Sequence, residues 1–335
     1  MPLTATALDA LVRKTARETA PEGPGPVAVG AVLGDETALC GADPTALFEI
    51  GSVSKTFTAL ALARLVVRGA LDWERPLATL LPPEAEVPER DGRAVTLGQL
   101  ACHTSGLPRL PRGLLPRAPW DASDPYARCQ EPALLEELAR TRLKSTPGRR
   151  FRYSSFGAGL LGLALARHTG GGYDALIQRE ICAPLGLRDT RVALDEERSA
   201  RLVPGHSYRG RPRPNWDLAD LAGAGGLHST PADMLRFAVA QLGDTSGELA
   251  EAIALTHTTG ARVHRAHTAH PGLYGTRLPA SAGRHAVLFH NGRTAGYHTL
   301  LALAPARQAA VVLLSARARS VDRAGFGLLT RLACA

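Results

Sequence analysis

The sequence predicts an α+β fold in which one antiparallel sheet is built from both ends of the chain. Strand-like apolar runs lie near the start, at 27–34 and 36–42, and again near the end, at 273–279, 285–292, 296–305 and 309–316. The residues between them have helical spacing and long Pro- and Gly-rich connections. We therefore expect a sheet domain made of 1–75 and 258–335, a helical domain inserted at 76–257, and a functional cleft between the two.

The N-terminal part of the sheet domain is expected to hold a helix, a hairpin and a second helix. Over the first 20 residues apolar side chains recur at helical intervals between charges, and the PEGPGP segment then ends the helix. The runs 27–34 and 36–42 are separated only by Asp35, which is typical of a β-hairpin. In the segment 48–71 the second half is almost entirely apolar, so a long helix is expected there, ending near Gly69.

The middle of the chain is expected to be helical, and its end to form strands and one last helix. Helices are expected at 131–143, 157–169, 173–182 and 231–242. The last of these begins at Ser229-Thr230-Pro231, where a polar N-cap is followed by proline in the first turn. A closing helix at 322–334 and the N-terminal helix are expected to cover the sheet face.

Three histidines, His264, His267 and His270, are spaced as HxxHxxH in a segment that is expected to be a loop. The spacing is similar to that of a metal-binding tract, but no carboxylate or cysteine lies nearby to complete a ligand set. The five cysteines are scattered and odd in number, without a CxxC pair. We therefore expect no metal, no other cofactor and no disulfide framework.

The composition is that of a globular protein. Of the 335 residues, 45% are hydrophobic and 21% charged, which excludes a disordered or fibrous chain. No apolar run approaches the length of a membrane span, and no continuous apolar stretch follows a basic start, so a cytoplasmic location is predicted. The net charge is +8, but the basic residues are dispersed and lack interleaved aromatic residues. No nucleic-acid or membrane partner is expected.

The first candidate for chemistry is the segment from Ser52 to Lys55, at the start of the long apolar helix. The two residues are three apart, so their side chains lie on one face about one turn apart. A helix N-terminus offers free backbone N–H groups, and a neutral lysine can take the proton of a serine there. Only three of the 39 lysine and arginine residues are lysines, and an arginine could not serve because a guanidinium stays protonated. The alternative is an N-cap serine beside a solvated lysine.

Two further candidates lie far along the chain. Tyr153 precedes an apolar helix, and a tyrosine there can act as a general acid or base when a cation lowers its pKa. His290-Asn291-Gly292 ends an apolar strand, where the glycine lets a ligand approach the strand backbone. The alternatives are a half-buried packing tyrosine and an ordinary Asn-Gly hairpin turn.

These motifs occur together in the order SxxK, YxS and HxG, and longer stretches support them. The stretches are FEIGSVSKTFTALALARLVVRGALDWERPL, VTLGQLACHTSGLP, FRYSSFGAGLLG, ICAPLGLRDT and AGGLHSTPADMLRF. Over about 27–315 the chain resembles the class C β-lactamase and DD-carboxypeptidase-like family, within the serine β-lactamase and penicillin-binding-protein superfamily. The resemblance implies a β-lactamase/transpeptidase-like fold with its active site between the two domains.

The resemblance also implies catalytic roles. Ser52 would be the acylated nucleophile and Lys55 its proton acceptor. Tyr153 would pass a proton to the leaving group and activate the incoming water or amine. The backbone N–H groups of Ser52 and Arg293 would form the oxyanion hole, and His290 stands where many relatives carry a lysine.

Three further residues are implied to contact the substrate: Ser155, Asn291 and Gly292. Relatives with β-lactamase or DD-peptidase activity usually have asparagine at the position of Ser155. Serine is shorter and lacks the amide donor. Together with the missing export signal, this departure disfavours peptidoglycan and β-lactam substrates.

We therefore expect a serine hydrolase or acyltransferase that acts on a small ester or amide. Water, an amine or an alcohol would accept the acyl group, which includes a transacylase role in natural-product biosynthesis. A β-lactamase or D-Ala-D-Ala carboxypeptidase is one alternative, and a non-catalytic binding protein on the same fold is another. The loops at 107–130 and 204–220 are expected to shape the pocket, and Trp120, Tyr208 and Trp216 either line it or pack elsewhere.

Overall fold

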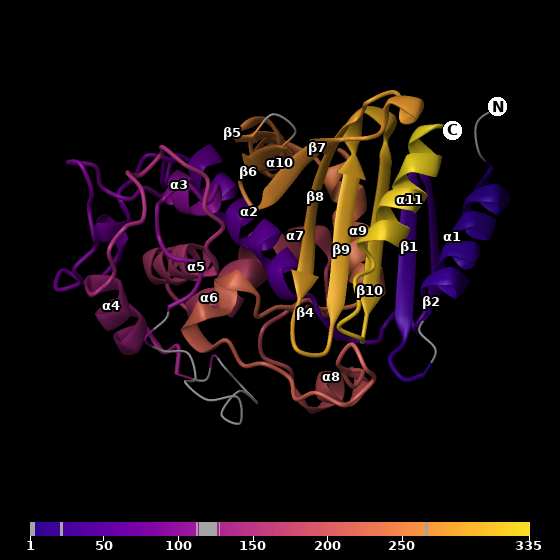
Figure 1. Cartoon of the computed structure of the whole chain (residues 1–335), viewed down its shortest axis with the longest axis horizontal. Coiled ribbons are helices and arrows are strands. Elements are labelled where there is room, and N and C mark those ends of the chain that lie inside the picture. The colour runs from indigo at the N-terminus through magenta and orange to yellow at the C-terminus, as the bar shows by residue number, and fades with distance from the viewer. Residues whose placement is uncertain (1–3, 21–22, 112, 114–125, 127, 265–266) are drawn as a thin grey trace.

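The computed structural model describes residues 4–20, 23–111, 113, 126, 128–264 and 267–335. Its main element is an eight-stranded sheet whose neighbouring strands are all antiparallel (Figure 1). In spatial order the strands are β2 (Glu36–Gly41), β1 (Val27–Leu33), β10 (Ala309–Ser315), β9 (His298–Ala304), β8 (Ala286–Arg293), β7 (Leu273–Arg277), β6 (His267–His270) and β5 (Ala261–His264). The N-terminal hairpin thus pairs with the last strand, which confirms the predicted α+β sheet built from both chain ends.

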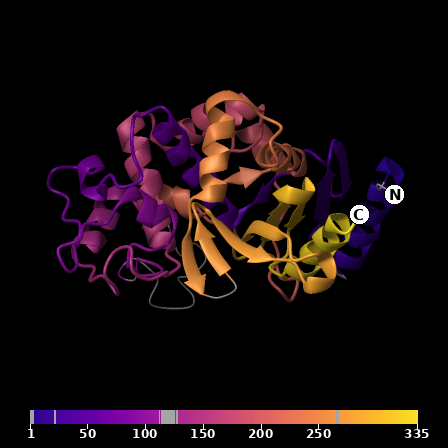
Figure 2. The same cartoon turned by 90° about the horizontal axis from the view of Figure 1, so that it is seen from above.

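Both faces of the sheet are buried, because apolar side chains point to either side of its central strands. On β10, Val311 and Leu313 belong to one apolar core, while Val312 and Leu314 belong to the other. The terminal helices α1 (Ala5–Thr19) and α11 (Asp322–Ala333) cover the first of these faces, as expected (Figure 2). The second face packs against α9 (Pro231–Gln241), which contacts β1 and β10.

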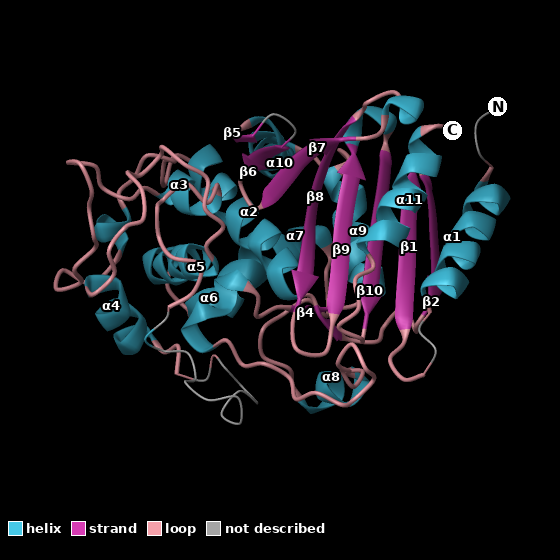
Figure 3. Cartoon of the chain, viewed as in Figure 1, coloured by secondary structure: helices cyan, strands magenta, loops and turns pink. Residues whose placement is uncertain are grey.

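Helix α2 (Ser54–Val67) lies at the centre of the molecule and is buried on nearly all sides. Every residue from Ser54 to Leu65 is buried, as its almost uniformly apolar sequence requires. The remaining helices, shown in Figure 3, are α3 (Leu97–Ala101), α4 (Glu131–Ala139), α5 (Ser155–Thr169), α6 (Gly172–Ile177), α7 (Ala183–Leu185), α8 (Glu196–Arg201) and α10 (Gly247–Thr258). Most of these helices fall within 76–257, the range predicted to form the helical domain. Because α9 falls in that range yet packs on the sheet, the division at 76–257 stays a prediction.

One local expectation is wrong. The histidine-rich segment was expected to be a loop, but His264 and His267 lie in the β5–β6 hairpin, in paired register. The edge strand β5 and its neighbour β6 are short and polar, so their backbone pairing leaves no apolar alternation in the sequence. The helix expected at 173–182 is present, α-helical as far as Ile177 and continued by a π-helical turn, Gln178–Cys182.

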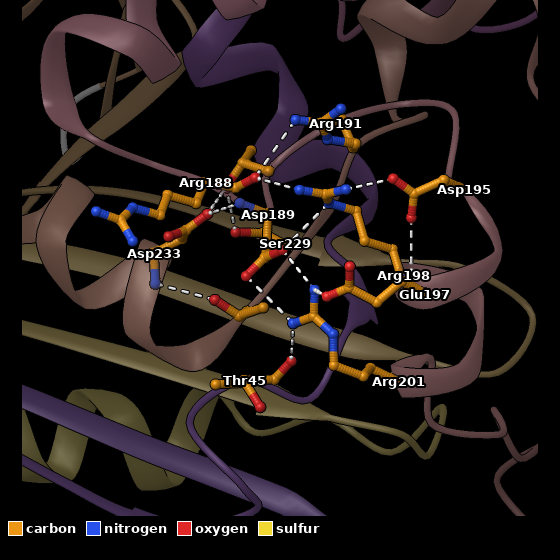
Figure 4. A network of polar contacts seen from close by, with 12 residues as sticks. Thr45, Arg188, Asp189, Arg191, Asp195, Glu197, Arg198, Arg201, Ser229 and Asp233 are labelled. Atoms are coloured by element: carbon orange, nitrogen blue, oxygen red, sulfur yellow. Dashed lines mark hydrogen bonds and ion pairs between the residues drawn. The ribbon is translucent and has the colours of Figure 1, made fainter.

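A polar network holds the segment that leads to the strand β3 (Phe48–Glu49) against α8 (Figure 4). Arg201 donates to Asp189 at 2.6 Å and to the carbonyl oxygen of Thr45 at 2.9 Å. Arg198 forms a second ion pair with Asp189 at 3.2 Å. The network therefore fixes the chain just before it enters the candidate active site.

A buried ion-pair cluster around Glu180 gives a testable stability prediction. Glu180 is buried and pairs with Arg64 Nε at 3.3 Å and Arg68 Nη1 at 2.8 Å, which joins the π-helical turn to α2. The change Glu180→Gln would leave the buried Arg64 with only the exposed Glu248, 3.5 Å from its Nη2, as a counter-charge. We expect the free energy of unfolding to fall by about 3–5 kcal/mol in urea titrations.

The exposed Glu136–Arg140 pair is the matched control for this cluster. The change Glu136→Gln is expected to alter the free energy of unfolding by less than about 0.5 kcal/mol, because exposed pairs contribute little. Equal losses in the two variants would contradict the assignment of the Glu180 cluster as a buried structural pair.

Candidate active site

Ser52 lies in a tight 3-10 turn, Gly51–Val53, that leads directly into α2. The turn is possible because Gly51 has a φ of +51°, and a Cβ there would lie only 2.9 Å from the backbone nitrogen of Arg293. The turn therefore packs directly against the end of β8. Ser52 remains partly accessible at the helix start, where backbone N–H groups favour developing negative charge.

Lys55 lies one turn further along and is directed at the serine. Its Nζ donates to Ser52 Oγ at 2.9 Å and to the carbonyl oxygen of Ala224 at 2.5 Å, and the side chain is buried. Burial lowers the pKa of Lys55, because desolvation disfavours the ammonium; the nearby Arg109 charge acts in the same direction, against the opposing influence of Tyr153. Lys55 is thus set up to be neutral more readily than a surface lysine.

Tyr153 is the second side chain that contacts the serine oxygen. Its hydroxyl donates to Ser52 Oγ at 2.8 Å, and Lys55 Nζ lies 5.1 Å from the centre of its ring. Burial alone would raise the pKa of Tyr153, but the Lys55 charge and hydrogen bonds to the phenol outweigh it, so the net pKa is lowered. The structure thus brings together the three residues that the sequence analysis proposed as catalytic.

His103, which the sequence analysis did not select, packs against the ring of Tyr153. It is buried, has a φ of +58°, and its ring centre lies 4.5 Å from that of Tyr153. Its Nδ1 accepts a hydrogen bond from the backbone N–H of Ser154 at 3.2 Å, and burial lowers its pKa well below the ordinary value. A neutral histidine therefore fixes both the ring and the backbone of the tyrosine motif. The sequence did carry a signal for His103, because the residue lies in the stretch VTLGQLACHTSGLP, which resembles the same family.

The end of β8 forms the other wall of the site. Its pairing with β7 ends at Phe289, so the strand edge from His290 onward is open on that side. Gly292 is needed there, because a Cβ would lie 2.0 Å from the carbonyl oxygen of Ile50. Arg293 lies opposite His298 on β9. The next residue, Thr294, donates its backbone N–H to the carbonyl oxygen of Tyr297 and so closes the hairpin.

This register sets the direction of the Arg293 backbone. Bonded and non-bonded pairs alternate along an antiparallel ladder, so the Arg293 N–H points away from β9 and toward the Gly51 turn. The N–H groups of Ser52 and Arg293 can therefore converge on one oxyanion, which is the arrangement implied for the oxyanion hole.

His290 is a neutral group in the wall of the site. Its Nδ1 lies 2.7 Å from the carbonyl oxygen of Asn291, and burial lowers the pKa of His290 to about 3, with the Lys55 charge acting in the same direction. Within the described residues its Nε2 has no hydrogen-bond partner. Asn291 lines the cavity too, but its amide donates to Asp322 at 2.9 Å.

The neutrality of His290 gives a prediction for the pH dependence of kcat/KM. Acylation needs Lys55 without its extra proton, so the rate should rise with pH to a midpoint below the ordinary lysine pKa. Because burial lowers the pKa of His290 to about 3, far from the range in which Lys55 titrates, His290→Gln should leave that midpoint unchanged even if the rate falls. A shift of one pH unit or more in the variant would show that His290 titrates with the reaction.

These residues open into one cavity of about 1170 Å³. Its described lining is Ser52, Arg109, Leu110, Tyr126, Tyr153, Ser155, Arg213, Pro214, Trp216, Tyr274, His290, Asn291, Gly292, Arg293, Thr294, Ala295 and His298. All of the proposed site residues are in this set except Lys55, which is buried behind Ser52. The cavity is large enough for a drug-sized substrate.

A small side pocket of about 40 Å³ adjoins the cavity next to Ser52. Its walls include Tyr126 and Trp216, whose ring centres are 5.2 Å apart. Trp216 therefore lines the site, whereas Tyr208 is exposed and Trp120 lies outside the described residues. The sequence could not select these wall residues, because nothing in their local pattern shows which loop faces the cleft.

Two observations concern the expected absences. In the described ranges no group of three or more histidine, cysteine, aspartate or glutamate residues is placed to hold a metal ion. No helix within that same part of the chain is long and apolar enough to cross a membrane.

Comparison with known proteins shows which family the chain is similar to. A family model described as Beta-lactamase matches residues 24–333. The D-alanyl-D-alanine-carboxypeptidase/endopeptidase AmpH of Escherichia coli (strain K12) is 34% identical over 191 residues, which are 56% of this chain and 47% of that protein. The chain spans about half the length of the curated relatives that it matches first.

Solved structures share the fold over nearly the whole chain. The D-alanine carboxypeptidase AmpC from Burkholderia cenocepacia has a TM-score of 0.81 at 23% identity, covering 98% of this chain and 100% of that chain. A class C beta-lactamase has a TM-score of 0.80 at 20% identity, covering 96% and 94%. These likenesses confirm the predicted β-lactamase/transpeptidase-like architecture.

Proposed function

The chain belongs to the beta-lactamase family, and from this premise we propose that it is an acyl-transfer enzyme that forms an acyl-enzyme on Ser52. One observation carries the proposal: Ser52 Oγ lies 2.9 Å from Lys55 Nζ and 2.8 Å from the Tyr153 hydroxyl. Proton transfer to and from a serine requires neighbouring groups with lowered pKa values. The partly accessible Ser52 has two such neighbours, Lys55 and Tyr153. A serine with only a structural role needs neither.

In the acylation step, Ser52 Oγ attacks the carbonyl carbon of a small ester or amide. Lys55 takes the serine proton as the Oγ–carbon bond forms, and the N–H groups of Ser52 and Arg293 stabilise the oxyanion. When the tetrahedral intermediate collapses, the bond to the leaving group breaks. Tyr153 gives its proton to the departing oxygen or nitrogen and recovers one from Lys55, so both groups return to their starting states.

In the deacylation step, water, an amine or an alcohol takes the acyl group. Tyr153, together with Lys55, accepts the proton of the incoming nucleophile, and Ser52 Oγ is reprotonated as it leaves. The identity of the acceptor decides between hydrolysis and transacylation. We favour transfer from a small ester or amide, with a role in natural-product biosynthesis and a cytoplasmic location as further predictions.

A β-lactamase or D-Ala-D-Ala carboxypeptidase is the second candidate, and the relatives named above support it. Against it, Ser155 stands in the cavity wall where such enzymes usually have an asparagine amide. Rapid hydrolysis of a chromogenic cephalosporin would favour this candidate over the first. A non-catalytic binding protein is disfavoured by the close contacts among Ser52, Lys55 and Tyr153.

The test is the partition of the acyl group between water and an amine. The enzyme is mixed with 4-nitrophenyl acetate, with and without glycinamide, and the nitrophenol burst and acetylated products are measured. We expect a burst of about one nitrophenol per chain and acetylglycinamide well above the uncatalysed level. A burst followed by acetate alone would indicate a hydrolase, and nitrophenol release no faster than that from Ser52→Ala would overturn the proposed function.

A further inference from the structure

A short 3-10 helix, η6 (Ala219–Ala224), ends beside Lys55 and forms part of the wall of the small side pocket. The last carbonyl groups of a helix find no N–H donor inside the helix itself. In η6 two of them accept hydrogen bonds from side chains of α2. The Gly223 carbonyl accepts from Thr58 Oγ1 at 2.8 Å. The Ala224 carbonyl accepts from Lys55 Nζ at 2.5 Å. Lys55 and Thr58 are three residues apart, so one face of α2 holds both carbonyl groups.

Tyr173 sets the direction of the hydrogen bond from Thr58. Its hydroxyl lies 2.7 Å from Thr58 Oγ1, and in the part of the chain that the structure describes this hydroxyl has no other partner. Burial raises the pKa of Tyr173, so the phenol keeps its proton and donates it to Thr58. The Thr58 proton is then left for a carbonyl group, and that of Gly223 is nearer, at 2.8 Å against 3.2 Å for Ser54. A chain of donors therefore runs from Tyr173 through Thr58 to the Gly223 carbonyl.

Helix α5 supports both ends of this hydrogen-bond chain through one glycine. A Cβ at Gly162 would lie 2.9 Å from the Cα of Gly223 and 3.1 Å from the ring of Tyr173. The absence of a side chain at this position lets η6 and the tyrosine ring pack directly on the α5 backbone. Thr58 itself is buried. The members of the chain therefore have little freedom to turn toward other partners.

The position of the Ala224 carbonyl matters for what Lys55 can do. A neutral amine has two N–H bonds and one lone pair, and it accepts the serine proton only when the lone pair faces Ser52 Oγ, 2.9 Å away. A fixed acceptor for one N–H restricts rotation about the Cε–Nζ bond and so helps to set this orientation. The carbonyl also stabilises the ammonium form, because a charge-assisted hydrogen bond is stronger than a neutral one. It therefore limits how far burial lowers the pKa of Lys55.

From this arrangement we propose that Thr58 and Tyr173 are positioning residues whose hydroxyl groups fix the end of η6. They thereby hold the Ala224 carbonyl where it orients Lys55 toward the serine. Neither residue touches the reacting atoms. The inference rests on the proposed function, because it assigns the two hydroxyls a role in the same acyl transfer. A structural role alone would make the hydroxyls necessary for stability but not for the proton affinity of Lys55.

The proton affinity of Lys55 can be measured without any substrate. The chain has only three lysines, and the other two, Lys14 and Lys144, are exposed. NMR titration of protein labelled with [ε-¹³C]lysine therefore follows Lys55 as the resonance that titrates below the ordinary lysine range, and its loss in Lys55→Met confirms the assignment. We expect Thr58→Val to lower the midpoint of Lys55 by at least about half a pH unit, because the displaced carbonyl no longer stabilises the ammonium.

The same variants are compared in the turnover of 4-nitrophenyl acetate. Thr58→Val should lower the plateau value of kcat by about tenfold with little change in KM, since the lysine is misdirected while the cavity is intact. Tyr173→Phe should shift the midpoint in the same direction but less, because Thr58 can still reach Gly223. Thr58→Ser keeps the hydroxyl and should keep the wild-type midpoint. The matched control is Thr256→Val, which removes a buried hydroxyl that bonds to the Ile253 carbonyl within α10, and it should not move the midpoint.

The outcomes separate this inference from the proposed function. A folded Thr58→Val protein with the wild-type midpoint and kcat overturns the positioning role, and so does a Thr58→Ser protein that shifts as far as Thr58→Val. If Thr58→Val does not fold in urea titrations, the double variant Thr58→Val/Tyr173→Phe, which leaves no tyrosine hydroxyl unpaired, is measured in its place together with Tyr173→Phe. If the wild type releases nitrophenol no faster than Ser52→Ala, the proposed function fails, while the NMR midpoints still show whether the two hydroxyls control Lys55.

Discussion

Replacing Ser52 by alanine is expected to lower kcat for ester turnover by about 10⁴-fold or more. The serine oxygen is the only atom in the account that bonds to the acyl group, and Lys55 and Tyr153 both direct their polar atoms at it. Alanine removes that atom without disturbing the packing, since Ser52 is only partly buried. Steady-state hydrolysis of 4-nitrophenyl acetate measures the effect.

The matched control is Ser281→Ala. Ser281 is exposed and lies in the connection between β7 and β8, at the end of β8 away from the site. Its activity should equal that of the wild type. If Ser52→Ala keeps more than about a tenth of the wild-type kcat while the protein is folded, Ser52 is not the nucleophile, and another group must carry the acyl chemistry.

Replacing Lys55 by arginine is expected to lower kcat/KM by about 10³-fold, because a guanidinium cannot give up its proton near neutral pH. The positive charge is kept, so the change separates proton acceptance from simple electrostatic attraction. Lys55 has a lowered pKa because it is buried, and this property is lost in the variant. The rising limb of the pH profile should disappear together with most of the rate.

The same substitution at an exposed lysine, Lys144→Arg, is the control and should leave the rate unchanged. Because arginine is larger, Lys55→Met is measured beside it, and urea titrations establish that both variants fold. A folded Lys55→Arg enzyme with near-normal activity and an unchanged pH profile would contradict the role of Lys55 as proton acceptor.

Much of the fold follows from local patterns in the sequence. Strands such as β1 and β10 are apolar on both faces, and α2 is apolar all round, so their type is set by their own residues. The strands β5 and β6 were missed because polar residues can pair by backbone bonds alone. The packing of α9 on the sheet was missed because periodicity shows which face is apolar but not what covers it.

The candidate site was predictable where spacing or a motif carried the information. Ser52 and Lys55 are close along the chain, and the contact between Ser52 and Tyr153 followed from the family resemblance rather than from local pattern. Arg109 could not be selected, since its importance lies in a contact with Tyr153 that only the folded chain makes, and His103 was marked only by the family resemblance of its stretch. Tertiary contacts of this kind leave no periodic signal in the sequence.

The central claim is that an acyl group becomes bound to Ser52, and intact-protein mass spectrometry tests it most directly. The wild type and Ser52→Ala are mixed with 4-nitrophenyl acetate, quenched in acid and weighed, and the labelled peptide is sequenced. We expect one acetyl group per chain on Ser52 in the wild type and none in Ser52→Ala. A wild type that carries no label and releases nitrophenol no faster than Ser52→Ala, or equal labelling of both proteins at another residue, would contradict this claim.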